Sequence, residues 1–181
     1  MATYCGQNVG ACRLDRLGQG IRSCSLLGLG YSVIAFGAMT LFAQPCAMLF
    51  LNPNEPQLAW LVELTSRYTI TATAFFFPLA LVNIIRFSIQ GMGYSAFAIF
   101  SGVLEMLART GVGMGLVPMF GYSAVCFASP AAWIAADLFL IPASIGCIRR
   151  LRRIYPNQPE QPEGNEAASV CPKPLKAGAG Q

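Results

Sequence analysis

Long apolar stretches, separated by short polar breaks, dominate the pattern of this chain. Residues 23–51 contain no charged side chain, and this length exceeds the roughly 20 apolar residues that a helix needs to cross a bilayer core. Further apolar segments follow at about residues 58–85, 94–118 and 122–148. Strands of a membrane barrel would alternate in segments of about ten residues, whereas these segments are much longer and apolar on all sides. The pattern therefore predicts an all-α integral membrane protein with four transmembrane helices.

The composition supports a membrane protein and argues against several soluble classes. Of the 181 residues, 55% are hydrophobic and 11% are charged, and the mean hydropathy is +0.53. A soluble domain carries about a quarter charged residues. The chain has no histidine, and none of its seven cysteines forms a CxxC motif, so we expect no metal site, no disulfide and no cofactor. The absence of a nucleophile–base pair and of a phosphate-binding loop argues against an enzyme.

The two ends of the chain differ from its apolar middle. Residues 1–22 are interpreted as the end of a transmembrane helix followed by a loop. Residues 149–181 begin with an arginine cluster at 149–153 and continue in a tail rich in Pro, Glu and Gln, which is expected to be disordered. The arginine cluster lacks interleaved aromatic residues, so its expected partner is membrane lipid and not nucleic acid.

The arginines are distributed unevenly between the two sides of the predicted bundle. They precede the first segment, follow the second and follow the fourth, whereas Arg67 is the only basic residue near the opposite ends. Cytoplasmic loops of membrane proteins carry an excess of Lys and Arg. We therefore expect a multi-pass protein of the cell membrane with both termini in the cytoplasm.

Two polar strings carry a resemblance to a known family. The first, QN-x-GA-x-x-x-x-R, consists of Gln7, Asn8, Gly10, Ala11 and Arg16. The second, R-x-x-x-QG-x-G, consists of Arg86, Gln90, Gly91 and Gly93. With GVLE at 102–105 and PAAW at 130–133, their order and spacing resemble the C-terminal third of the multidrug and toxic compound extrusion (MATE) transporters.

This resemblance implies a cation-coupled antiporter, driven by Na⁺ or H⁺, that exports drugs and other organic, often cationic, compounds. Members of the family have twelve helices in two lobes around a central cavity. The chain would supply the end of the eighth helix and the ninth to twelfth helices, and would be a fragment that lacks its partner, the N-terminal lobe. One branch of the family has a cation-binding Asp in the tenth helix, but the corresponding position falls near Leu79, with no acidic residue nearby.

Three ionisable residues inside the predicted membrane segments are candidates for ion coupling or transport, because charges in a membrane are costly and often functional: Glu105, Arg109 and Asp137. Glu105 and Arg109 stand four residues apart and share one helix face. They form either a coupling-ion site tuned by Arg109 or an ion pair that holds the helix against its neighbours. An antiparallel hairpin of the last two segments would bring Asp137 near the depth of Glu105, unless the two side chains point apart.

Polar side chains in the second segment are candidates for lining a cavity: Thr65, Thr69, Thr73 and Asn83. The alternative is that the threonines bond to carbonyl groups of their own helix. Arg86 and Gln90, at the cytoplasmic exit of this segment, are expected to have a structural or gating role.

A second functional hypothesis is a self-contained four-span protein, either a small dimeric exporter or a scaffold that transports nothing. A free-standing exporter of this size would need a carboxylate for its substrate early in the chain, and residues 23–51 have none. The residues before the first segment also resemble the end of a helix. Both features favour the MATE interpretation.

Overall fold

A computed structural model describes residues 1–51 and 56–155 of the chain. The predictions made for the C-terminal tail lie outside the described residues. The elements, in order, are α1 (Ala2–Gly10), α2 (Asp15–Phe50), α3 (Leu58–Ala74), α4 (Phe76–Gly91), α5 (Ser95–Gly111), the π-helix η1 (Val112–Leu116), α6 (Val117–Phe120) and α7 (Tyr122–Ile154).

The prediction of an all-α membrane fold is confirmed. Three helical stretches in the described residues are long and apolar enough to cross a membrane: Asp15–Phe50, Ser95–Phe120 and Tyr122–Ile154. The pair α3 and α4 passes the same test when the two helices are taken together, which gives up to four spans if the bent pair is counted as one. Many large apolar side chains face outward, as expected for helices whose solvent is lipid.

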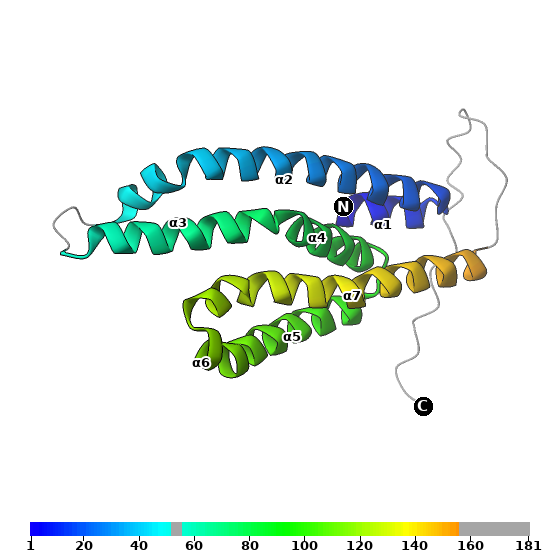
Figure 1. Cartoon of the computed structure of the whole chain (residues 1–181). Coiled ribbons are helices and arrows are strands. Elements are labelled where there is room, and N and C mark those ends of the chain that lie inside the picture. The colour runs from blue at the N-terminus through cyan, green and yellow to red at the C-terminus, as the bar shows by residue number, and fades with distance from the viewer. Residues whose placement is uncertain (52–55, 156–181) are drawn as a thin grey trace.

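The long helices form two antiparallel hairpins (Figure 1): α2 lies along α3 and α4, and α5 lies along α7. α7 also packs against α3 and α4, so it joins the two hairpins. α1 lies beside the start of α2 and the end of α4 (Figure 1). We call this end of the bundle the basic end, because it carries exposed arginines at both the start of α2 and the end of α7: Arg13, Arg16, Arg22, Arg149, Arg150, Arg152 and Arg153.

The span formed by α3 and α4 is broken, a feature not predicted from the sequence. The two helices are bent by 50°, and Phe75 lies between them. Pro78 explains the break, because proline has no N–H to donate to the carbonyl of Ala74 and its ring clashes with that carbonyl in a regular helix. The Phe75 N–H instead bonds to the Ala72 carbonyl at 3.2 Å, which tightens the last turn of α3.

The helix that starts with α5 also changes its pitch before it ends. In η1 the Val117 N–H reaches the carbonyl of Val112, five residues back, which is the pattern of a π-helix. The helix continues through Pro118 to Phe120, and the chain turns at Gly121, whose φ is +58°. Of the residues 118–121 at which a break is predicted, 118–120 are thus helical and only Gly121 forms the turn.

A cluster of buried side chains joins α1, α4 and α7. α1 contributes Cys5, α4 contributes Val82 and Ile89, and α7 contributes Trp133 and Leu140. Cys5, Ile89 and Leu140 are fully buried. The cluster therefore ties the short first helix to two of the long ones.

Glycine allows α1 to approach α4 closely. A Cβ atom on Gly91 would lie 2.2 Å from the backbone oxygen of Ala2, far inside van der Waals contact. Gly93 follows with a φ of +89°, a conformation that side chains other than glycine rarely adopt. The two glycines of the string R-x-x-x-QG-x-G thus have different structural roles. Gly91 permits the contact between α1 and α4, and Gly93 forms the turn into α5.

The expectation that the chain contains no disulfide is only partly correct. Cys5, Cys24, Cys46, Cys126 and Cys147 are free thiols. Cys12 is disulfide-bonded, so the expectation of no disulfide is wrong for this residue. Cys12 belongs to no CxxC motif, which is the spacing signal on which the expectation relied.

The contact at Gly91 yields a first prediction. Gly91→Ala should lower the thermal stability of the purified chain, because the new methyl group collides with rigid backbone; overpacking of this kind costs about 1–3 kcal/mol. Gly102→Ala is the matched control, since nothing lies within 4 Å of a Cβ at that position in α5. Equal melting temperatures for the two variants in detergent would contradict the close approach of α1 and α4.

Candidate functional site

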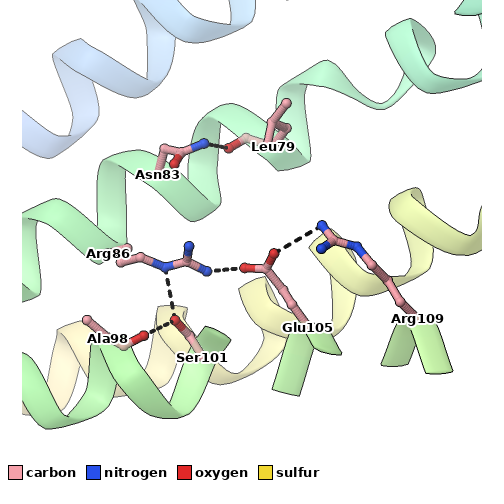
Figure 2. A network of polar contacts seen from close by, with 7 residues as sticks. All are labelled: Leu79, Asn83, Arg86, Ala98, Ser101, Glu105 and Arg109. Carbon is pink, nitrogen blue, oxygen red and sulfur yellow. Dashed lines mark hydrogen bonds and ion pairs between the residues drawn. The ribbon is translucent and has the colours of Figure 1, made fainter. Parts of the chain in front are cut away.

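A polar cluster lies between α4 and α5 in the apolar interior (Figure 2). Ser101, Glu105 and Arg109 follow each other at intervals of four residues, so α5 presents them on one face. α4 contributes Arg86, whose guanidinium points across to this face (Figure 2). Ser101 is fully buried and Glu105 is 9% exposed.

Arg86 is the main partner of Glu105. Its Nη2 atom forms an ion pair with Glu105 Oε1, and its Nε–H donates a hydrogen bond of 3.0 Å to the Ser101 hydroxyl. Ser101 in turn donates to the Ala98 carbonyl at 2.8 Å. The serine thus accepts from the arginine and is itself fixed by the backbone, which orients the guanidinium toward Glu105.

Arg109 occupies the other carboxylate oxygen of Glu105. Its Nη2 atom lies 3.3 Å from Oε2, and its side chain is 47% exposed. The predicted pair of Glu105 and Arg109 therefore exists, but it is the weaker and more exposed of two ion pairs. The contact across the helices to Arg86 was not predicted from the sequence, which indicated only that this arginine lies at the exit of the second segment.

Asp137 has a different environment. It lies on α7, is 7% exposed, and its Oδ1 atom has no hydrogen-bond partner in the part of the chain that the structure describes. α7 packs against α5, so Asp137 and Glu105 are carboxylates on neighbouring helices. Among the described residues, Glu105 thus has both oxygens paired, whereas the Oδ1 atom of Asp137 has no partner.

The polar side chains of the second segment bond within their own helices. Thr69 donates to the Thr65 carbonyl at 2.8 Å, Thr73 donates to the Thr69 carbonyl, and Asn83 donates to the Leu79 carbonyl at 2.9 Å (Figure 2). Thr65 is exposed on α3. These contacts match the alternative interpretation of the threonines, and the cavity-lining role stays a prediction.

The first polar string forms a corner between α1 and α2. The Ala11 N–H bonds to the Gln7 carbonyl at 2.9 Å, and the Arg13 N–H bonds to the Asn8 carbonyl at 2.8 Å. The Tyr4 hydroxyl donates to the Arg16 carbonyl at 2.9 Å, which closes the corner. The end of the second string, at Gly91, packs against the start of α1. The second string therefore contacts α1 at its start, at Ala2, whereas the first string forms the end of α1.

Two hollows on the described surface lie away from the polar cluster. The first, of about 350 Å³, is lined by η1, α6 and α7, with Leu116, Phe120 and Phe127 among its side chains. The second, of about 340 Å³, lies against the first half of α2 and Phe77. None of the ion-coupling candidates lines either hollow. Among the described residues, no group of three or more Cys, Asp or Glu could hold a metal ion.

Sequence reasoning missed Arg86 and Ser101 as members of the site, although signals for both were present. Ser101 stands four residues before Glu105, on the same face of α5. Arg86 and Ser101 stand at similar sequence distances from Gly93, so an α4–α5 hairpin brings them to one level. Counting residues from the turn, as was done for Glu105 and Asp137 in the hairpin of the last two segments, would also have paired Arg86 with Ser101.

The asymmetry of the two ion pairs yields a second prediction. Arg86→Gln should destabilise the chain strongly, because breaking a buried pair costs about 3–5 kcal/mol. Arg109→Gln, at the exposed side of the same carboxylate, should cost about 1 kcal/mol or less. The double variant Arg86→Gln with Glu105→Gln should recover much of the loss, as measured by thermal unfolding in detergent. A loss for Arg109→Gln as large as that for Arg86→Gln would contradict the assignment.

Comparison with known proteins places these features in a family. A family model described as MatE matches residues 1–124, well over half of the chain. The match includes both polar strings and the cluster of Arg86, Ser101, Glu105 and Arg109, and ends before Asp137. No curated protein and no solved structure gives a significant match. The chain therefore belongs to the MatE family of multidrug and toxic-compound efflux transporters.

Proposed function

We propose that the chain works in a cation-coupled antiporter that exports drugs and other organic, often cationic, compounds across the cell membrane. Membership of the MatE family supports export, and the membrane-spanning helices support a multi-pass protein. Intramembrane carboxylates on α5 and α7 supply groups that can bind Na⁺ or H⁺ as the coupling ion.

The free oxygen of Asp137 is the observation on which the assignment of the coupling group rests. A coupling carboxylate must exchange its ion during each transport cycle. Glu105 is held on both oxygens by arginines, so an incoming cation would first have to displace one of them. Asp137 is buried, and its Oδ1 atom has no partner among the described residues. We therefore assign ion exchange to Asp137, and we assign to Glu105 the positioning of α4 against α5.

Transport further requires a cavity that opens to each side of the membrane in turn. In secondary transporters such a cavity lies between two repeats that move relative to each other. Neither hollow on the described surface reaches the polar cluster. We therefore propose that helices of an N-terminal lobe complete the cavity, next to the faces of α2 and α5 that lie exposed in this chain.

The orientation in the membrane follows from the charge distribution. The basic end gathers the start of α2 and the end of α7, whereas α6 lies at the opposite end (Figure 1). Since positive residues are retained in the cytoplasm, we propose that the basic end and both termini are cytoplasmic.

Asp137→Asn should abolish ion-driven export. The amide keeps the shape of the side chain but cannot change its charge or exchange a cation, so we expect ion-driven export to fall to the background of cells that lack the chain. The measurement is cationic dye export from cells that express the chain together with the N-terminal lobe of a related transporter. Asp15→Asn is the matched control, because Asp15 is an exposed aspartate at the basic end.

Two outcomes of this experiment would contradict the proposal. Full-rate, gradient-dependent export by Asp137→Asn would exclude Asp137 as the coupling group. Ion-dependent dye export by the 181-residue chain expressed alone would favour the self-contained exporter over a part of a larger transporter.

Accessibility labelling tests the orientation. In a background with the native cysteines replaced by serine, Met119→Cys in α6 should react with an impermeant thiol reagent in intact cells, because Met119 is 76% exposed at the end opposite the arginines. Ala11→Cys, in the corner between α1 and α2, should react only after permeabilisation. The reverse pattern of labelling would overturn the proposed orientation.

A further inference from the structure

The end of α7 carries four arginines, and the structure divides them into two kinds. The guanidinium of Arg150 lies 6.0 Å from the centre of the Tyr94 ring, within the range of a cation–π contact. Arg152 Nη2 lies 3.6 Å from Asp15 Oδ1, which connects the end of α7 to the start of α2. Arg149 and Arg153 are exposed, and neither takes part in the ion pairs found among the described residues.

Arg149 and Arg153 stand four residues apart, so they lie on one face of α7. Their Cα atoms are separated along the axis by about 6 Å, at about 1.5 Å per residue. Arg149 directly follows the last apolar residue of the segment, Ile148, which places it at the edge of the hydrocarbon layer. The headgroup layer beyond that edge is about 5–7 Å thick on each side of a bilayer. The two guanidiniums thus cover the depth at which lipid phosphates lie.

We propose that Arg149 and Arg153 form a binding site for the phosphate of an anionic phospholipid such as phosphatidylglycerol. Guanidinium groups bind phosphate oxygens with charge-assisted hydrogen bonds. The side chains of Arg150 and Arg152 already have contacts within the chain, so Arg149 and Arg153 are the arginines at this end of α7 that are left to bind a phosphate. The site lies outside the polar cluster of α4 and α5, and it does not depend on the proposed transport function.

The test measures lipid selectivity of the full chain reconstituted in phosphatidylcholine vesicles. Spin-labelled phosphatidylglycerol and spin-labelled phosphatidylcholine report the relative association constant at the protein surface. The double variant Arg149→Gln with Arg153→Gln should lower the preference for phosphatidylglycerol, by roughly fivefold for each arginine removed. Both residues are exposed, so the helical circular dichroism of the variant should equal that of the parent chain.

The double variant Arg150→Gln with Arg152→Gln is the matched control. It removes the same charge from the same turns of α7, but takes away side chains that already have partners within the chain. A clearly smaller loss of selectivity than in the first double variant would support a site. Equal losses would show diffuse attraction by net charge, and would overturn the proposal. Loss of the preference on addition of soluble inorganic phosphate would assign the site to a free anion and would also overturn it.

Discussion

Charged groups buried between these lipid-facing helices need partners within the protein. A charged group taken out of water alone costs several kcal/mol, even after the protein relaxes. Glu105 meets this constraint with Arg86 from α4 and Arg109 from its own helix. Because Arg86 crosses from one helix to the next, the same contact that neutralises Glu105 also sets how α4 lies against α5. Ser101 adds a geometric restraint, since it accepts a hydrogen bond from Arg86 while its own proton is committed to the backbone.

Departures from regular helix geometry lie on both sides of this polar cluster. Pro78 bends the second span by 50° before the chain reaches Asn83 and Arg86. Gly91 and Gly93 then allow contact with α1 and a tight turn into α5. Beyond Arg109, the π-helix η1 changes the pitch before the turn at Gly121. Pitch changes and broken spans are common in transporters near sites that bind ions or substrates. In this chain they set the angles at which the ion-pairing helix faces meet.

Much of the fold could be predicted from sequence because a membrane helix needs a long apolar run, and the runs here are separated by clear polar breaks. Glu105 and Asp137 could be identified as candidates by the same logic, since charges inside such runs are rare. The partner of Glu105 was harder to find. Local spacing identifies Arg109, whereas Arg86 becomes a neighbour only when α4 packs against α5. Pro78 indicates a break in its helix, but the size of the bend depends on packing against α2 and α7. The disulfide at Cys12 leaves no local spacing signal at all.

We propose that the two buried carboxylates have different roles: Glu105, paired on both oxygens, holds α4 against α5, and Asp137 exchanges the coupling ion. Infrared difference spectroscopy of the full chain in lipid vesicles, recorded on addition of acid or Na⁺, can separate these two roles. We expect carboxyl bands from one buried group that disappear in Asp137→Asn and persist in Asp15→Asn. Bands that persist in Asp137→Asn, or their absence from the parent chain under both conditions, would contradict the proposal.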